Sequence, residues 1–286
     1  MVKEKKEKKQ KEPDIYMSAV NMPVINYNVY YMKFLEKTLY FLAAFLVGAI
    51  VGYLFYGGIG KDEFGNATMF TYICDSVICF SMGIMIGILF LPIRTKQIIK
   101  KRKKVLRGQF RDMLEALSTS LNAGKNVTGA FASVYEDLQL QYDEGAYILY
   151  ELKVILSGVQ NNIDIEDILY DLGNRSKIED IESFANVFKI SYRKGGNMKE
   201  IIRNTHDILS DKMEIEDEIE TIVAGSKNEQ MIMIFMPILL VGMIKGMSSD
   251  FAANFVTPIG LIATTIAIIM FIVAYFVGQK ILDIKV

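Results

Sequence analysis

Four long apolar stretches, one pair near each end, limit what this chain can fold into. They are Leu39–Gly60 and Met69–Ile93 in the first pair, and Met231–Met247 and Thr257–Gly278 in the second. About 20 helical residues cross a hydrocarbon core, so each stretch is a candidate span, although the third is short. Asp75 and Lys245 are their ionisable residues, and we expect Lys245 to snorkel to the interface. Hydrophobic residues make up 51% of the 286-residue chain, which is high for a soluble protein. We therefore predict a multi-pass membrane protein with four transmembrane helices.

The distribution of basic residues predicts the orientation of these spans. Four spans with two short outer connections place both termini and the long central segment on one side. That side carries Lys3, Lys5, Lys6, Lys8, Lys9, Lys11, Lys33, Lys37, Arg94, Lys96, Lys100, Lys101, Arg102, Lys103, Lys104, Arg107 and Arg111. The opposite connections hold only Lys61 and Lys245. By the positive-inside rule, the termini and the central segment are cytoplasmic, and the protein lies in the cell membrane.

This pattern divides the chain into four parts. Residues 1–38 form a lysine-rich cytoplasmic segment, 39–93 a transmembrane hairpin, 94–230 a cytoplasmic domain, and 231–286 a second hairpin with a short tail. The domain opens with a basic run, of which Lys101, Arg102, Lys103, Lys104 and Arg107 are the membrane-flanking members. We expect this run to set the orientation and to contact anionic lipid.

The N-terminus and the cysteines indicate no processing and no disulfide framework. Polar and mixed sequence separates the lysine-rich start from the apolar run at Leu39, so we expect no cleavable signal peptide. Cys74 and Cys79 both lie in the second span, five positions apart and therefore on different helix faces. We expect neither a disulfide nor a metal site from them.

The central segment has apolar residues at helical spacing, without the alternation of a strand. Six amphipathic helices are predicted in three hairpins, and their apolar stripes must be buried against one another. The stripes run within 110–121, 127–138, 148–156, 165–172, 181–192 and 198–209. The predicted fold class is therefore all-α, with a cytoplasmic six-helix bundle between two transmembrane hairpins.

A helix stop followed by a helix start recurs three times in this segment. The stops are glycines suited to a left-handed turn, and the starts are Asn or Asp residues suited to capping. The stops are Gly124, Gly158 and the pair Gly195 and Gly196; the starts are Asn126, Asp164 and Asn197. Asp167 and Glu200, three residues after the last two starts, resemble the acidic half of a capping box. We predict structural turns, with direct partner contact as the alternative.

No catalytic, cofactor or metal site is indicated. The single histidine, His206, has no nucleophile signature around it, and "GIGKDEF" and "NAGKNVT" lack a phosphate loop's Lys-Ser or Lys-Thr pair. The acidic run Asp207, Asp211, Glu214, Glu216, Asp217, Glu218 and Glu220 lacks the ligand spacing of a calcium loop. It reads as a solvated face or a partner surface. The turn after Gly124 is not followed by a basic recognition surface, so nucleic acid is not an expected partner. We predict a protein that is not an enzyme.

Three stretches resemble the type II secretion system F domain, found in platform proteins of type II secretion, type IV pili and the tight-adherence (Tad) pilus. They are "FRDMLEALSTSLNAGKNVTGAF" from Phe110, "FANVFKISYRKGGNMKEIIRNTHDIL" from Phe184 and "FVTPIGLIATTIAIIMFIVAYFVGQKIL" from Phe255. One such domain between two pairs of spans is similar to the Tad branch, with its TadB and TadC members. In the family, the pair Gly195 and Gly196 corresponds to the turn between the last two helices of the F domain.

The resemblance implies a membrane platform for pilus assembly or secretion. The implied partners are a cytoplasmic assembly ATPase, pilin subunits, a second F-domain platform protein and the lipid bilayer, in a homo- or hetero-oligomer. The residues leave a second hypothesis open, a membrane-tethered signalling or adaptor protein whose helical bundle binds a soluble regulator. A small transporter fits less well, because Asp75 and Lys245 are few ionisable groups for a substrate path.

Overall fold

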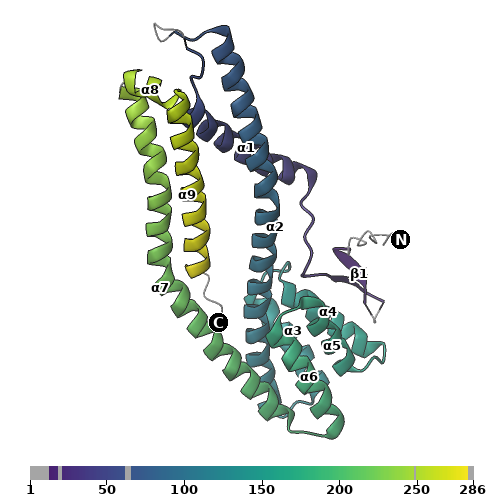
Figure 1. The fold of residues 1–286 in the computed structure, drawn as a ribbon. Helices are drawn as coiled ribbons and strands as arrows, with labels where there is room; N and C mark the ends of the chain where they lie inside the picture. The colour runs from purple at the N-terminus through teal and green to yellow at the C-terminus, as the bar shows by residue number, and fades with distance from the viewer. Residues whose placement is uncertain (1–12, 19–20, 62–65, 248, 283–286) are drawn as a thin grey trace, which may run out of the picture. The chain divides into compact units, whose positions relative to one another are not determined.

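The computed structural model describes residues 13–18, 21–61, 66–247 and 249–282, and most of them are helical (Figure 1). The strands are β1 (Ile15–Met17) and β2 (Pro23–Ile25). The helices are α1 (Phe34–Tyr56), α2 (Met69–Asn122), α3 (Val127–Gln141), α4 (Tyr147–Gln160), α5 (Ile165–Ser176), α6 (Glu179–Lys194), α7 (Met198–Met247), α8 (Ser249–Phe255) and α9 (Pro258–Leu282). The lysines from Lys3 to Lys11 and residues 283–286 of the predicted tail lie outside the described residues.

The chain forms two compact units. One, the helical domain, consists of residues 1–31 and 95–213; the other, the apolar unit, consists of residues 32–94 and 214–286. The boundaries at 94 and 213 fall inside α2 and α7, so each of these helices belongs to both units.

Four of the described helices are long and apolar enough to cross a membrane: α1, α2, α7 and α9. They coincide with the four predicted spans, and the prediction of a membrane protein is supported by length and composition. The orientation of the spans stays a prediction. The boundaries differ from the predicted ones, because α1 begins at Phe34, α2 continues to Asn122 and α7 begins at Met198.

Glycines let α1 and α2 approach closely within the apolar unit. A Cβ added at Gly48 would lie 3.0 Å from the Gly83 Cα, and one added at Gly83 would lie 2.6 Å from the Phe45 ring. A Cβ at Gly87 would lie 2.6 Å from the Phe41 ring. Small residues commonly line contacts between membrane helices. Lipid provides no hydrophobic driving force between apolar helices, so close packing of their backbones contributes to association.

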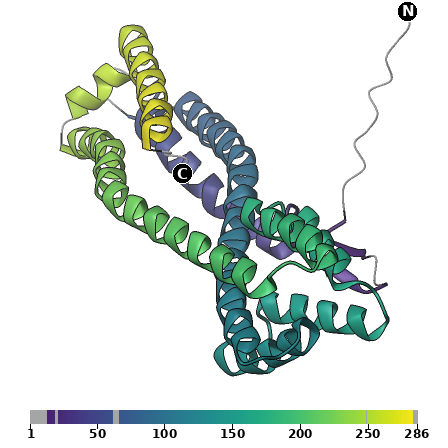
Figure 2. The ribbon, with the colours of Figure 1, turned by 90° about the horizontal axis from the view of Figure 1, so that it is seen from below.

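The core of the helical domain is built from the apolar stripes of six helical segments. Phe110 on α2, Phe131 on α3 and Phe184 and Phe188 on α6 are fully or almost fully buried. The Phe110 and Phe184 rings meet edge to face at 5.4 Å. Figure 1 and Figure 2 show α3 to α6 gathered beside the part of α2 that belongs to this domain.

The predicted bundle of six separate helices is not confirmed. Helix α3 to helix α6 are separate, but the first predicted segment is the end of α2 and the last is the beginning of α7. Residues 94–109 and 210–230 connect these segments to the apolar stretches. They are rich in Lys, Arg, Glu and Ile and contain no proline, so the helix continues through them.

An N-terminal arm, residues 13–18 and 21–31, was not predicted to fold. Its strands β1 and β2 pair antiparallel, with Tyr16 opposite Val24. Val24 and Tyr27 are fully buried and belong to the core of the helical domain. The arm therefore adds a small sheet to an otherwise helical structure.

The three predicted turns all exist, but one has a different left-handed residue. Gly124 (φ +87°) and Gly195 (φ +70°) end α2 and α6 as predicted. The amide after each donates to the carbonyl five residues back, Lys125 to Ser120 (3.3 Å) and Gly196 to Ser191 (2.8 Å). This is the hydrogen-bond pattern of a Schellman motif.

The prediction for Gly158 is wrong. Gly158 lies inside α4, which continues to Gln160, and the left-handed residue is Asn162 with φ +58°. The Ile163 amide donates to the Gly158 carbonyl at 3.0 Å, so the same motif closes four residues later than expected. Asparagine adopts this conformation more readily than most residues with a side chain, so it can end a helix where a nearby glycine suggests a different end.

The predicted caps differ in how far they are formed. The Asn126 side chain accepts from the Gly129 amide at 2.8 Å, and Asn197 accepts from the Glu200 amide at 3.4 Å. The Asn197 side-chain amide also donates to the Glu200 carboxylate at 3.2 Å. Asp164 precedes α5 without a side-chain capping bond, so its predicted capping role is not borne out.

Replacing Gly195 by Ala should lower the free energy of unfolding by about 1 kcal/mol, because an L side chain at positive φ is strained. No atom lies within 4 Å of a Cβ at this position, so strain alone sets the cost. Gly124→Ala should behave alike. Gly145→Ala is the control, because Gly145 also has open space but no positive φ. Thermal unfolding of the full chain in mild detergent measures all three, and equal melting points would contradict the turn assignment.

Candidate functional site

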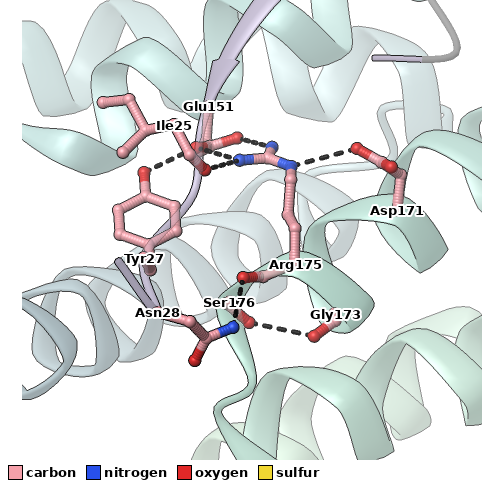
Figure 3. A network of polar contacts seen from close by, with 8 residues as sticks. All are labelled: Ile25, Tyr27, Asn28, Glu151, Asp171, Gly173, Arg175 and Ser176. Carbon is pink, nitrogen blue, oxygen red and sulfur yellow. Dashed lines mark hydrogen bonds and ion pairs between the residues drawn. The ribbon is translucent and has the colours of Figure 1, made fainter. Parts of the chain in front are cut away.

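Two clusters of polar contacts hold parts of the helical domain together. The first, the buried cluster, consists of Tyr27, Glu151, Asp171 and Arg175 (Figure 3). The second, the Asp180 cluster, consists of Arg107, Asp180 and Lys212. Neither was predicted from the sequence.

An ion pair between two helices lies at the centre of the buried cluster. The Arg175 side chain on α5 is 3% exposed and the Glu151 side chain on α4 is 1% exposed. Arg175 donates from Nη1 to Glu151 Oε1 at 2.8 Å and from Nη2 to Oε2, a two-pronged contact. Its Nε donates to Asp171 Oδ2 at 3.0 Å. A fixed guanidinium fork suits this geometry, which lysine could not reproduce.

The N-terminal arm closes the buried cluster. The Tyr27 hydroxyl donates to Glu151 Oε1 at 2.6 Å. Arg175 Nη1 donates to the Ile25 carbonyl at 3.3 Å, and the side-chain amide of Asn28 donates to the Arg175 backbone carbonyl at 3.2 Å. Burial, together with the Glu151 carboxylate, raises the pKa of Tyr27, so the phenol stays a neutral donor. The cluster therefore fastens the arm to α4 and α5.

Basic residues of α2 hold the other side of the arm. The Arg102 guanidinium lies 4.3 Å from the centre of the Tyr30 ring and 3.8 Å from the Asp14 carboxylate. Lys103 Nζ donates to Asn28 Oδ1 at 2.5 Å and to the Lys177 carbonyl at 3.3 Å. Partial burial lowers the pKa of Lys103.

The Asp180 cluster ties α6 to both long helices. Asp180 stands in the first turn of α6, 2.6 Å from Arg107 Nε on α2 and 3.0 Å from Lys212 Nζ on α7. The Asp180 and Arg107 side chains are 16% and 13% exposed. These contacts lie beside the apolar core, in which Ile202 and Leu209 of α7 are buried. One carboxylate thus links the two helices that continue into the apolar unit.

The predicted membrane-flanking residues divide into two groups. Arg102, Lys103 and Arg107 are engaged within the helical domain, as described above. Lys101 and Lys104 are exposed. Lipid contact by the run stays a prediction, and three of its five named residues have a second role that composition does not reveal.

The acidic run of α7 lies largely on the surface. Asp207, Asp211, Glu214 and Glu218 are exposed and follow one edge of the helix at spacings of four, three and four. Three isoleucines, seven residues apart, lie next to that edge: Ile208 is 67% exposed, Ile215 50% and Ile222 69%. We call these seven residues the acidic face of α7.

Chemistry-bearing residues do not converge in the described part of the chain. His206 contacts Asp207 at 3.2 Å and Ser210 at 3.4 Å, close to it along the same helix. Cys74 and Cys79 are free thiols. Within the described ranges, no three His, Cys, Asp or Glu side chains are placed to hold a metal.

The missed residues left a weak signal in the sequence. Glu151 falls among Ile148, Leu152 and Ile155, at a position of the apolar stripe where a charge is out of place. Arg175 follows Ile168 and Leu172 on the buried face of α5 in the same way. Two opposite charges on buried stripes suggest an ion pair, although their separation in sequence hides the pairing.

No family model, curated protein or solved structure matches this chain. The resemblance to the F-domain family therefore stays a prediction from the residues alone.

Replacing Glu151 by Gln should lower the free energy of unfolding by about 3 kcal/mol, because the buried Arg175 then loses its two-pronged counter-charge and keeps the more exposed Asp171 carboxylate. Tyr27→Phe should cost about 1.5 kcal/mol, since it removes one hydrogen bond to a charged group. Tyr135→Phe is the matched control, as the Tyr135 hydroxyl bonds only to exposed Gln139 in the contacts described, and should change little. Denaturant unfolding in detergent measures the differences in free energy of unfolding. A Tyr27→Phe protein as stable as the control would contradict the fastening of the arm by the buried cluster.

Replacing Asp180 by Asn should cost about 1.5–3 kcal/mol, because both charge-assisted contacts weaken at a largely buried position. Asp167→Asn is the control. Asp167 also pairs with two cations, Lys189 and Arg193, but its side chain is 43% exposed, so about 1 kcal/mol or less is expected. Equal losses of free energy of unfolding in the two variants would show that the ion pairs of Asp180 contribute no more than ordinary surface pairs.

Proposed function

We propose that this protein is a membrane platform of a Tad or type IV-like pilus, or of a type II-like secretion machine, and that it couples an assembly ATPase to pilin movement. One observation carries the proposal. Helices α2 and α7 each run unbroken from the helical domain into an apolar stretch, and Asp180 ties both to the same short helix. This arrangement suits a part that passes motion between a soluble motor and the membrane.

The physical reason lies in the stiffness of a helix. A flexible linker would absorb a displacement, whereas an α-helix transmits it along its axis because its turns are hydrogen-bonded to one another. Pro92 in α2 and Pro237 in α7 each remove one of these bonds and leave the others in place. The buried cluster joins α4 to α5, and the Asp180 cluster joins α6 to α2 and α7. A force applied to the surface of the helical domain would therefore reach α2 and α7.

The proposal includes the orientation, the partners and the F-domain resemblance. In it, the helical domain is cytoplasmic, the ATPase docks on that domain, and pilin subunits meet the apolar unit. Assembly with a second F-domain protein and with further copies of the chain would arrange several such units around a filament axis. The chain itself supplies no nucleotide hydrolysis.

A membrane-tethered adaptor is the second candidate, and the acidic face of α7 is the observation that favours it. Exposed isoleucines beside a row of carboxylates could receive a basic amphipathic helix of a soluble regulator. Genes for a secretion ATPase and prepilins next to this one support the platform, whereas sensor or regulator genes support the adaptor.

Deleting the gene should abolish surface filaments while prepilin processing continues, because the platform acts after processing. Electron microscopy of cells and immunoblots of prepilin report the two steps. Complementation with the native gene should restore filaments, and complementation with Asp180→Asn should restore fewer than Asp167→Asn at equal membrane levels. Normal piliation in the deletion strain would exclude the platform and leave the adaptor.

A further inference from the structure

Lys245 is the ionisable residue of the third apolar stretch, and its surroundings show a use for its charge. It lies on α7, near the C-terminal end of that helix, and is half-buried within the apolar unit. Its Nζ donates to the Leu54 carbonyl at 2.9 Å and contacts the Phe55 carbonyl at 3.5 Å. The same Nζ lies 4.9 Å from the centre of the Phe255 ring.

The carbonyls that Lys245 meets belong to the last turn of α1. The final four carbonyls of a helix lack partners within the helix and carry the negative end of its dipole. Helix α1 has no basic residue of its own in that turn. Carbonyls without a partner are costly wherever little water reaches them, so a cation from another helix is a strong ligand for this end.

Two further contacts bring the second hairpin to the same end of α1. The Tyr56 hydroxyl and the Thr265 hydroxyl of α9 are 3.0 Å apart and hydrogen-bonded. A Cβ added at Gly242 of α7 would lie 3.1 Å from Leu54 Cδ1, so the two helices are close together at this position. Asp75, the other ionisable residue of the spans, accepts from the Gly58 amide at 2.8 Å and holds the connection that follows α1.

We propose that Lys245 is an interhelical clip: it caps the C-terminus of α1 from α7 and so joins the two transmembrane hairpins into one body. The clip explains why a lysine occupies an apolar stretch without a substrate path. It also means that α1, α2, α7 and α9 respond together when α2 or α7 is displaced. The inference concerns the apolar unit alone and holds whether the protein is a platform or an adaptor.

Cysteine cross-linking on the full chain in membranes tests the clip. Cys74→Ala and Cys79→Ala remove the native thiols, and Leu54→Cys with Gly242→Cys places one thiol on each hairpin. The Leu54 carbonyl is a backbone group and is kept, and the smaller side chain at 54 makes room for the one at 242. A short bis-maleimide should cross-link this pair efficiently when Lys245 is native.

Lys245→Met removes the charge and keeps an apolar side chain of similar length. It should reduce the cross-link between the hairpins at least fivefold. Lys245→Arg keeps a cationic donor and should retain most of it. Phe45→Cys with Phe80→Cys, at rings 5.9 Å apart within the first hairpin, is the control pair and should cross-link equally in all three proteins.

Each outcome decides the question. An undiminished cross-link between the hairpins in the Lys245→Met protein would overturn the clip. Loss of the control cross-link as well would also overturn it, because Lys245 would then be required to fold one hairpin and not to join two. Loss in Lys245→Met and Lys245→Arg alike, with the control intact, would show that the fit of lysine and not its charge holds the joint.

Discussion

Helices α2 and α7 continue through residues 94 and 213, where the chain passes from one compact unit to the other, although Pro92 and Pro237 each remove one backbone hydrogen bond inside the apolar stretches. Nucleating a helix is costly and extending one is not, so a helix that starts in an apolar stretch propagates until a residue stops it. Gly124 stops α2 and the Asn197 cap starts α7. The packing of α3 to α6 depends on how far α2 and α7 continue, because these short helices pack on the ends of the two long ones.

The buried charges of the helical domain fix how these packed helices lie against one another. Apolar stripes bring helices together but leave them free to slide and rotate, because hydrophobic contact has little direction. Glu151 with Arg175, and Asp180 with Arg107 and Lys212, add contacts of fixed geometry between helices. Ion pairs of this kind are poor sources of net stability, since desolvation offsets their attraction. Their contribution here is to set the register between the helices that they join.

The local features of the fold were predictable and the non-local ones were not. The starts of α3 and α7 follow the capping residues Asn126 and Asn197, because capping signals act over three or four residues. Helix α5 also starts where predicted, after Asp164, although that side chain makes no capping bond. Tyr27 and Glu151 are 124 positions apart, and nothing in either neighbourhood indicates the other. The arm was missed for a related reason: two strands of three residues carry too little alternation to be recognised, and burial of Val24 and Tyr27 depends on a surface built elsewhere. The Gly158 error came from taking glycine as the left-handed residue, a conformation that Asn162 adopts instead.

Contacts between a cationic side chain and a backbone carbonyl recur in both the helical domain and the apolar unit. Lys103 binds the carbonyl of Lys177, which ends α5, and Lys245 binds carbonyls at the end of α1. Arg175 binds the Ile25 carbonyl at the end of β2. Each acceptor lies where a regular element ends and its last carbonyls lose their partners. A basic side chain from another element meets that need and ties the two elements by the same contact. Positively charged residues that would be read as lipid contacts or as transport sites can therefore serve to assemble helices, in the helical domain as in the apolar unit.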